Sequence, residues 1–325
     1  MEEYNNMAQQ PVRLIAVCGP TATGKTELAV HLARTLQGEI VSCDSMQIYR
    51  GFDIGTAKPN EDEQKAARHH LIGVVDPETD FSVSDYVGLA EKTILEITGR
   101  GKLPVLAGGT GLYMRSLLRG VRFEEHTRDD SVRQRLFKET ADYGNERLYE
   151  RLRQCDPAAA DAIHPGNLKR VVRALEYREV TGRLFSHQMK KRGEAAVRYD
   201  GPVFCLLYRD RRKLYDRINL RVDKMLQKGL LTEARQLYEL LRGRDHYPTV
   251  AQAIGYKELF PYFDGVISLE DAVTNIKRKT RNYAKRQITW FRKEENLQNI
   301  YIDDYSDFDG VLRTCLATLA KKGIE

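Results

Sequence analysis

A loop that can bind phosphate lies near the start of the chain. Residues Gly19–Thr26 read GPTATGKT and match the pattern G-x-x-x-x-G-K-[ST] at every fixed position. Glycines allow the backbone to curl so that several N–H groups face one hollow, where the start of the next helix adds partial positive charge. Lys25 adds a full charge, and the Thr26 hydroxyl can hold Mg²⁺. The predicted phosphate loop consists of Gly19, Pro20, Thr21, Ala22, Thr23, Gly24, Lys25 and Thr26.

A carboxylate follows the second apolar segment of the chain. The segment Ile40–Cys43 predicts a strand that delivers Asp44 to the carboxyl edge of a sheet, where ligands of open α/β folds bind. Three roles are open for Asp44: a ligand of Mg²⁺, the acceptor of a proton from a nucleophile, or the cap of a turn. Ser45, Gln47 and Tyr49 follow directly, and their amide and hydroxyl groups can bind a polar substrate such as a base edge.

Short apolar strands alternate with helical segments over residues 1–120. This alternation predicts β-α-β units and an α/β fold, namely a P-loop NTPase-like parallel sheet flanked by helices. The expected strands are Arg13–Cys18, Ile40–Cys43, Leu71–Val75 and Leu103–Ala107. The expected helices are Lys25–Leu36 and one that Ser82 caps and that runs to Thr98.

The pattern changes after residue 120. Residues 121–198 contain no strand-like run and many charged helical segments, such as Val132–Tyr143 and Leu168–Thr181. Val203–Tyr208 then predicts a returning central strand. We therefore interpret residues 121–198 as a helical insertion domain in an α/β core formed by residues 1–120 and 199–325. The remaining expected elements are helices at Arg211–Lys228, Leu231–Arg242, Leu269–Lys293 and Phe308–Lys321 and a strand at Asn299–Ile302.

One predicted helix is strongly basic. Residues 272–293 include eight Lys and Arg and no acidic residue, and helical spacing places Lys277, Arg281, Lys285 and Arg292 near one face. A stripe of this kind is typical of contact with a phosphate backbone. The alternative is a solvated helix face, but such faces usually mix both signs of charge. The helix is therefore expected to contact RNA.

Composition places the chain among globular proteins. It has 325 residues, 52 Lys and Arg against 46 Asp and Glu, a formal net charge of +6 and 42% hydrophobic residues. No apolar run approaches the ~20 residues that span a bilayer, and the polar N-terminus lacks a secretory signal. The five cysteines are scattered, which argues against a disulfide framework and a zinc site. We expect a cytoplasmic monomer with no membrane partner.

Seven short blocks, spread over most of the chain, carry a family resemblance. The blocks are Gly19–Thr26, Asp44–Tyr49, Asp53–Pro59, Gly108–Tyr113, Ile163–Pro165, Arg173–Glu176 and Lys285–Trp290. Together they resemble the tRNA dimethylallyltransferases (isopentenyl-diphosphate:tRNA transferases). The first block alone is shared with kinases and GTPases, whereas the second and third are highly specific. Cys315 stands alone where eukaryotic relatives carry a zinc finger, which indicates the bacterial type.

The resemblance implies a reaction. A dimethylallyl group passes from dimethylallyl diphosphate to the exocyclic N6 of an adenosine in tRNA, and diphosphate is released. The acceptor adenine lies just 3′ of the anticodon in tRNAs that read codons beginning with U. The implied partners are thus dimethylallyl diphosphate and the tRNA anticodon stem-loop, and the implied cofactor is Mg²⁺.

The resemblance also implies roles for single residues. Asp44 is the base that takes the N6 proton, Thr26 holds Mg²⁺, and Arg217 clamps the diphosphate held by residues 21–26. The residues implied to touch tRNA are Asp44, Ser45, Met46, Gln47, Thr110, Arg133, Lys169, Arg170, Arg173, Gln252, Gly255, Lys257, Lys285, Arg286, Gln287 and Arg292.

Other functions share parts of this sequence pattern. A nucleotide or small-molecule kinase would also use the phosphate loop, a helical lid and an acid after the second strand. An adenylate dimethylallyltransferase would use the same donor with free AMP, but it would need neither the long insertion nor the basic helix. A regulatory GTPase is disfavoured because no N-K-x-D segment for reading guanine is present.

Overall fold

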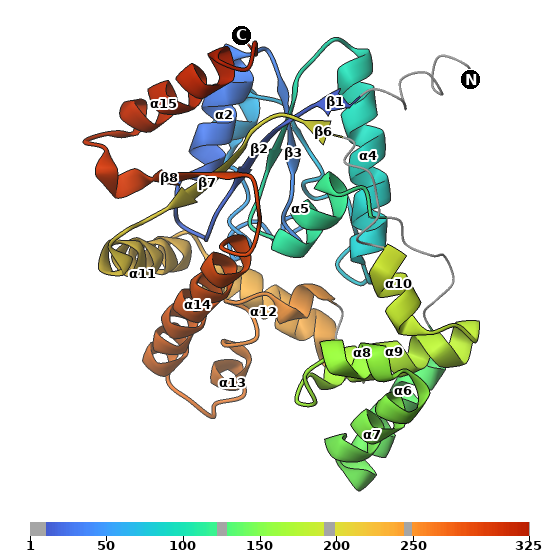
Figure 1. Cartoon of the computed structure of the whole chain (residues 1–325). Coiled ribbons are helices and arrows are strands. Elements are labelled where there is room, and N and C mark those ends of the chain that lie inside the picture. Colours follow the sequence, from blue (N-terminus) through green and yellow to red (C-terminus); the bar gives the residue numbers. More distant parts are fainter. Residues whose placement is uncertain (1–10, 122–128, 192–198, 244–248, 325) are drawn as a thin grey trace. The chain divides into compact units, whose positions relative to one another are not determined.

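The computed structural model of the chain describes residues 11–121, 129–191, 199–243 and 249–324 (Figure 1). The chain divides into two compact units: residues 1–118 with 197–325, here called the core unit, and residues 119–196, here called the insertion unit. Sequence patterns place the junctions at residues 121 and 198. Residues 122–128 and 192–198 at these junctions lie outside the described residues, as do residues 1–10.

A six-stranded sheet forms the centre of the core unit. Its strand order is β4-β3-β5-β2-β7-β8, and every pairing is parallel. The strands are β2 (Ile15–Cys18), β3 (Glu39–Ser42), β4 (His69–His70), β5 (Pro104–Ala107), β7 (Val203–Leu207) and β8 (Leu297–Tyr301). The central strands are apolar and buried, as expected when helices cover both faces of a parallel sheet. The predicted α/β class with a parallel sheet is therefore confirmed. Two further strands, β1 (Val12–Arg13) and β6 (Tyr199–Asp200), pair separately.

Helices lie on both faces of this sheet (Figure 1). On one face, α2 (Lys25–Thr35) and α15 (Phe308–Ala320) share an apolar core with the strands. On the other, α4 (Val83–Gly99) packs on β3 and β5, and α5 (Gly111–Leu118) packs on α4. Ser82 caps α4 as predicted, since its hydroxyl accepts from the N–H of Asp85 in a reciprocal capping box.

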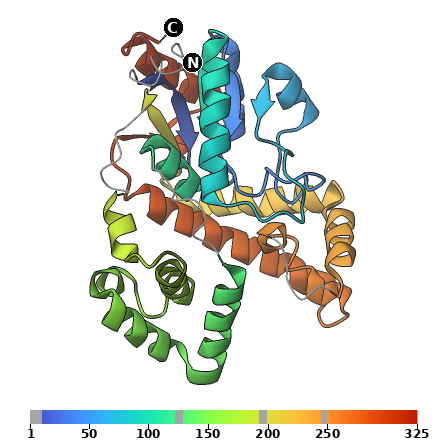
Figure 2. The same cartoon turned by 90° about the vertical axis from the view of Figure 1, so that its right-hand side faces the viewer.

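Helix α3 (Glu61–Ala66) packs against α2. The other helices of the core unit lie at the end of the sheet where the strands finish (Figures 1 and 2). They are α11 (Arg211–Gln227), α12 (Leu230–Leu241), α13 (Phe260–Phe263) and α14 (Leu269–Phe291), with short 3₁₀ turns η1 (Thr249–Gln252) and η2 (Ile302–Asp304). The basic helix α14 packs along α11. It crosses this end of the sheet and so approaches the phosphate loop.

Two basic residues of the predicted stripe face α11 rather than solvent. Lys277 forms an ion pair with Asp223 of α11 at 2.6 Å, and its side chain is 25% exposed. One turn further along, the Arg281 guanidinium donates to Asn219 at 2.6 Å. The two helices are thus joined by polar contacts at successive turns, which separates Lys277 and Arg281 from the exposed basic residues of α14.

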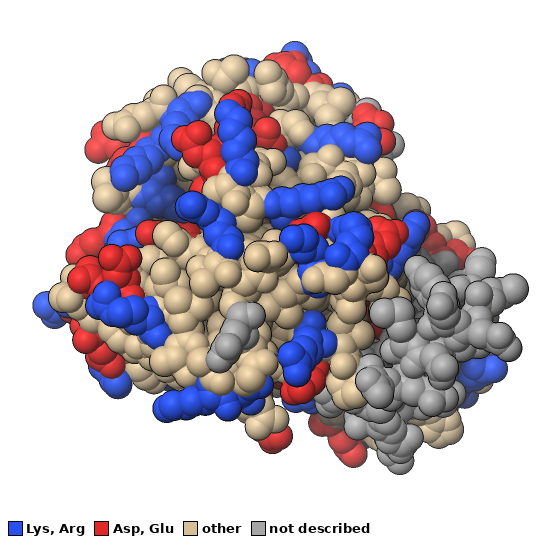
Figure 3. Space-filling view, turned by 90° about the horizontal axis from the view of Figure 1, so that it is seen from above, with Lys and Arg blue, Asp and Glu red and all other residues tan. Residues whose placement is uncertain are grey.

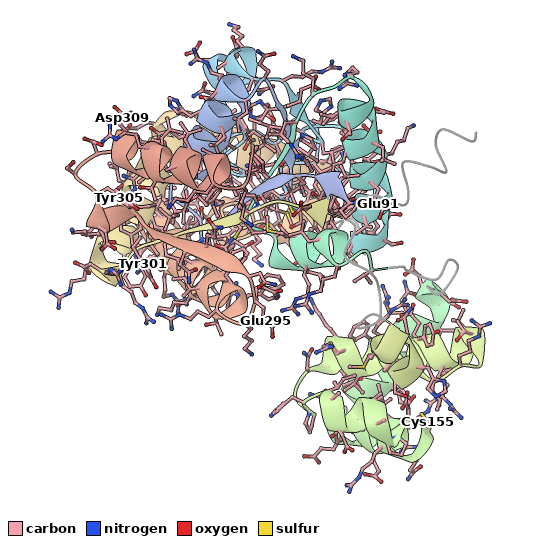
Figure 4. All side chains as sticks on the ribbon, turned by 45° about the horizontal axis from the view of Figure 1, so that its top comes forward. Glu91, Cys155, Glu295, Tyr301, Tyr305 and Asp309 are labelled. Atoms are coloured by element: carbon pink, nitrogen blue, oxygen red, sulfur yellow. The ribbon has the colours of Figure 1, made fainter. Side chains whose placement is uncertain are left out.

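The insertion unit is a helical assembly with its own core. Its helices are α6 (Asp130–Tyr143), α7 (Asn145–Cys155), α8 (Pro157–Ala162), α9 (Leu168–Thr181) and α10 (Phe185–Lys191), and its described residues include no strand. Leu136, Leu152, Val172 and Tyr177 are buried against one another. Cys155, labelled in Figure 4, lies at the end of α7 as a free thiol. A separate apolar cluster explains why this segment forms a compact unit.

One predicted strand is wrong. Residues 71–75 form no strand, and the edge strand of the sheet is His69–His70 instead. Leu71 and Gly73 have positive φ angles of 62° and 61°, which cannot continue an extended strand. The chain turns there, and the N–H groups of Val74 and Val75 donate to the Ile48 carbonyl. An apolar run predicts burial but does not exclude a turn.

Two further observations concern the cysteines and the longer helices of the described residues. All five cysteines lie within the described residues, and each is a free thiol. Over the same described ranges, no helix combines the length and apolar character needed to cross a membrane.

Candidate active site

The phosphate loop joins the central strand β2 to helix α2, and its shape depends on backbone conformations that favour glycine. Gly19 has φ 134°, and a side chain there would overlap the Leu206 carbonyl of the neighbouring strand β7. Gly24 has φ 83° and directly precedes the first turn of α2. Ala22, between them, also has a positive φ of 66°. These angles curl the loop around the first N–H groups of α2, which lack partners within the helix. The resulting hollow can bind an anion.

Side chains fix the curl of the loop from inside. The Thr23 hydroxyl donates to the Pro20 carbonyl at 2.9 Å, and the Lys25 ammonium donates to the same carbonyl at 2.7 Å. From α11, Arg217 donates through Nε to the Ala22 carbonyl at 3.1 Å. Arg217 therefore contacts the loop directly and lines the same cavity, and its role at the diphosphate stays a prediction.

Two cations of the site, Lys25 of the loop and Arg221 of α11, lie in an environment that disfavours their charge. Burial, followed by the nearby Arg221 guanidinium, lowers the pKa of Lys25 to about 8, although Asp44 acts in the opposite direction. Burial also lowers the pKa of Arg221, which Asp44 and Glu63 partly offset. Cations that are desolvated and close to one another are stabilised by a polyanion placed among them. The site is therefore prepared for a ligand with several negative charges.

Arg221 is a site residue that the sequence analysis did not identify. It lies on α11 four residues after Arg217, and both line the same cavity as Lys25. Residues four apart on a helix project from one face. This spacing was the available signal, but it was hidden among the many basic residues of α11.

Asp44 lies two residues after the end of β3, at the carboxyl edge of the sheet, as predicted. Its Oδ1 accepts hydrogen bonds from the N–H groups of Met46 at 2.9 Å and Gln47 at 3.4 Å. This is an Asx turn, so one oxygen has the structural role considered for this residue. Among the described residues, Oδ2 has no hydrogen-bond donor, and Asp44 lines the cavity. The carboxylate therefore keeps an oxygen that can accept a proton or bind a cation.

The residues after Asp44 are held by two other parts of the core unit. The Thr110 hydroxyl accepts from the Ser45 N–H at 3.0 Å, and the Thr110 N–H donates to the Cys43 carbonyl at 3.2 Å. The Gln47 amide accepts from the Ser42 hydroxyl at 3.1 Å and donates to the Ala57 carbonyl at 3.0 Å. The polar cluster after β3 is thus a fixed wall of the site.

A buried carboxylate holds the neighbouring part of the wall, formed by residues 53–59. Glu233 of α12 accepts from the backbone N–H groups of Asp53 at 2.6 Å, Ile54 at 2.9 Å and Gly55 at 2.8 Å. It also accepts from the Tyr256 hydroxyl at 2.7 Å. A carboxylate with four donors holds this turn firmly, because each bond to a charged acceptor is stronger than a neutral one.

Lys58 and Tyr283 also line the site, although the sequence analysis gave them no role in it. The Lys58 side chain is 5% exposed, donates to the Tyr49 carbonyl and pairs with Asp53. Tyr283 projects from α14, and burial followed by the charge of Asp44 raises the pKa of its hydroxyl. Helical spacing placed Tyr283 on an apolar face, and only the tertiary fold brings its hydroxyl close to Asp44.

These groups surround one cavity of about 1240 Å³ within the core unit. Its lining includes many of the predicted site residues, namely Thr21, Ala22, Thr23, Gly24, Lys25, Thr26, Asp44, Ser45, Met46, Gln47, Arg217, Gln252, Gly255, Lys257, Arg286 and Gln287. Thr110 acts behind this wall through Ser45. Lys285 and Arg292 are exposed on α14 but are not part of the lining.

The predicted RNA-contacting residues of the insertion unit fall into two pairs. Lys169 and Arg170 are exposed at the start of α9. Arg133 and Arg173 are about 30% exposed, and both donate to the fully buried carboxylate of Glu176, at 2.8 and 3.0 Å. The buried charge holds these two guanidinium groups side by side.

The site offers oxygen ligands that suit Mg²⁺. The Thr26 hydroxyl and the Asp44 carboxylate both line the cavity. Over the described ranges, no group of three or more His, Cys, Asp or Glu forms a metal-binding cluster. Mg²⁺ prefers oxygen and commonly takes one or two protein ligands together with substrate phosphates. The residues present therefore fit that ion.

Comparison with known proteins identifies the family. The profile of the IPP transferase family matches residues 47–294, and that of the isopentenyl transferases matches residues 12–80. A tRNA dimethylallyltransferase of Halalkalibacterium halodurans is 46% identical over 91% of this chain and 93% of that protein. The enzyme of the same name from Caldanaerobacter subterraneus is 43% identical over 96% and 98%.

Solved structures agree. The tRNA isopentenylpyrophosphate transferase of Bacillus halodurans is similar with a TM-score of 0.70 and 43% identity, over 96% of each chain. A eukaryotic dimethylallyltransferase described as acting on tRNA gives a TM-score of 0.81 at 28% identity, over 96% of this chain and 80% of that one. The resemblance seen in the seven sequence blocks is confirmed. The chain belongs to the tRNA dimethylallyltransferase family.

Proposed function

We propose that this protein transfers the dimethylallyl group of dimethylallyl diphosphate to N6 of the adenine directly 3′ of the anticodon, in tRNAs that read codons beginning with U. The observation that carries the proposal is the meeting of the phosphate loop and Asp44 in one cavity. The loop suits a diphosphate, and the free oxygen of Asp44 suits the proton of an attacking amine. We also propose a P-loop NTPase-like core, since the loop joins the central strand to α2.

The chemistry requires a good leaving group. An adenine amine is a weak nucleophile, so the bond between the allylic carbon and the diphosphate oxygen must weaken as N6 approaches. Lys25, Arg217 and Arg221 stabilise the negative charge that develops on the departing diphosphate, together with the loop N–H groups. A new N6–carbon bond forms, the carbon–oxygen bond breaks, and diphosphate leaves with the bonding electrons.

Asp44 has the task of accepting the N6 proton. Its Oδ1 is held by the Asx turn, which fixes the direction of the carboxylate and leaves Oδ2 available. Proton removal by a positioned base typically contributes about 10²–10⁴-fold to a rate. Thr26, with the diphosphate, would hold Mg²⁺, which adds positive charge at the leaving group.

The acceptor base must leave its stack to reach Asp44. Enzymes that modify a base commonly rotate it out of the helix into a pocket. The fixed wall of Ser45 and Gln47, together with Tyr283, surrounds the position that the adenine would occupy. The exposed basic residues of α14 and of the start of α9 are the proposed contacts with the RNA backbone.

A labelled-donor experiment tests this proposal. The protein is incubated with dimethylallyl diphosphate labelled in the allyl group and with unmodified tRNA, and label is followed into RNA. Transfer to a tRNA with adenine 3′ of its anticodon, and none when that base is replaced by guanine, is expected. Consumption of ATP without label in RNA would instead support the kinase alternative, and label in free AMP would support the adenylate transferase.

A further inference from the structure

The side chain of Gln287 joins two parts of the site that the sequence separates widely. Its Oε1 accepts the N–H of Thr21 in the phosphate loop at 3.0 Å, and its Nε2 donates to the Gly109 carbonyl at 2.9 Å. The residue is 6% exposed. Both ends of the amide are therefore used inside the protein.

The space around this amide is closely matched to it. A Cβ on Gly109 would lie 2.5 Å from Nε2 of Gln287. Glycine at this position therefore leaves room for the amide, and any side chain there would displace it. The tight fit means that the Gln287 side chain has one position between the loop and the end of β5.

The two ends of the Gln287 amide contact different parts of the site, the donor loop and the segment that holds Asp44. Thr21 belongs to the loop that faces the donor diphosphate. Gly109 directly precedes Thr110, whose hydroxyl and N–H hold Ser45 and Cys43 on either side of Asp44. The path from Thr21 through Gln287 and Gly109 thus connects the donor loop with the backbone of the proposed base. The distance between leaving group and base depends on this path.

We propose that Gln287 is a positioning residue that sets the spacing between the donor loop and Asp44, rather than a contact for tRNA. This inference rests on the proposed transfer reaction. It also gives α14 a second role, because the helix that carries exposed basic residues for RNA places Gln287 between the two reactive parts. Misplacement of reacting groups by about 1 Å can cost about 10²-fold in rate.

The test uses Gln287→Met, which keeps the length of the side chain and removes both hydrogen bonds. The full chain is assayed by single turnover with saturating dimethylallyl diphosphate and tRNA. The expected result is a rate lower by about 10- to 100-fold. Binding of inorganic diphosphate is expected to weaken, whereas the Kd for tRNA and its salt dependence remain as in the wild type. A residue that contacts tRNA would show the reverse pattern.

Two further variants keep the test decisive. Gly109→Ala displaces the amide from the other side and is expected to reproduce the rate loss with unchanged tRNA affinity, even if Gln287→Met folds poorly. Ile288→Val changes the neighbouring buried side chain of α14 without touching either hydrogen bond, and its rate is expected to match the wild type.

The outcomes separate this inference from the proposed function. Full single-turnover rates in both Gln287→Met and Gly109→Ala, or a tRNA affinity that falls as far as the rate, would overturn the positioning role. If the wild type transfers no dimethylallyl group to tRNA, the proposed function fails. Diphosphate binding then still tests whether Gln287 holds the donor loop in place, because it requires no acceptor.

Discussion

The two carboxylate oxygens of Asp44 have different surroundings, and a single substitution can separate their roles. Asn keeps an oxygen that accepts from the N–H groups of Met46 and Gln47, so Asp44→Asn preserves the Asx turn. It removes only the ability to take a proton. We expect a single-turnover rate at least about 10²-fold lower, with unchanged Kd for tRNA and an unchanged melting temperature.

Asp44→Ala is the matched comparison, because it loses the turn as well as the base. It is expected to be as slow as Asp44→Asn and also less stable. A rate for Asp44→Asn near that of the wild type would show that another group accepts the proton.

The lowered pKa of Lys25 predicts a pH dependence for donor binding. Burial and Arg221 bring this pKa to about 8 in the donor-free protein, so the ammonium is mostly charged at pH 7 and mostly neutral at pH 9. The affinity for dimethylallyl diphosphate should therefore fall by up to about tenfold between these values. Titration calorimetry at both values measures it. Lys25→Arg stays charged throughout, so its affinity should be much less sensitive to pH.

The same pKa shift acts on stability with a defined sign. The pKa of Lys25 in the folded chain lies below the ordinary value of 10.5, so between pH 8 and 10.5 the unfolded state binds more protons. The contribution of Lys25 to the free energy of unfolding therefore rises with pH across this window. Bound diphosphate removes the effect by restoring the charge. Equal affinity of the wild type for dimethylallyl diphosphate at pH 7 and pH 9 would contradict a lowered pKa for Lys25.

At the scale of elements, the basic residues of α14 differ in exposure and in partners. Lys285, Arg286 and Arg292 are exposed, whereas Lys277 and Arg281 are bound to α11. Replacing the three exposed residues with Ala should weaken tRNA binding. Each lost phosphate contact should reduce the slope of log K against log[salt] by about 0.7–0.9. Filter binding at several salt concentrations measures both quantities.

The face toward α11 supplies the control for this prediction. Lys277→Ala removes a partly buried ion pair with Asp223, so it should lower the melting temperature slightly and leave the salt slope unchanged. The assignment of the RNA face would be refuted by the reverse result, in which Lys277→Ala flattens the slope and the triple variant does not.

The sequence predicts most elements of this fold because their signals are local. Ser82 marks the start of α4, and the bounds of α9 match the predicted Leu168–Thr181. The segment Leu71–Val75 forms a turn in which Leu71 is buried and Val74 is exposed, so its apolar run does not mark a strand. Left-handed backbone at Leu71, a residue that rarely adopts it, leaves no trace in hydrophobic patterning.

The same distinction applies to the site. The phosphate loop is one continuous segment, and Asp44 directly follows an apolar segment, so each could be predicted from the sequence around it. Arg221 and Tyr283 come from helices far along the chain, and their places depend on how α11 and α14 pack on the sheet end. The amide of Gln287 is a clearer case, because its partners Thr21 and Gly109 are fixed only by the tertiary fold.

At the scale of the whole molecule, the two units predict separate unfolding. Each has its own apolar core, and the cavity is lined only by the core unit. Calorimetry should therefore show two transitions. Diphosphate at 100-fold excess over its Kd should stabilise the core unit by about 2.7 kcal/mol and raise only its transition, by about 5–10 °C. A single transition that shifts as one would show that the units unfold together.

Basic and acidic residues are mixed on one face of the molecule. Figure 3 looks onto the upper end of Figure 1 and shows Lys and Arg interspersed with Asp and Glu on that face. A net charge of +6 is small for 325 residues, so attraction of RNA depends on where the basic residues gather rather than on their total. The exposed residues of α14 form such a local concentration.

The strand order has a consequence for synthesis of the chain on the ribosome. Central strand β2 pairs on one side with β7, where Cys18 faces Cys205, so its partner emerges 187 residues later. At translation rates of about 5–20 residues per second, this delay lasts about 10–40 seconds. Throughout it, the nascent chain carries β2 with an open edge, and an open apolar edge can join other chains. The interval before β7 emerges is therefore the period in which a chaperone would matter most to the yield of this protein.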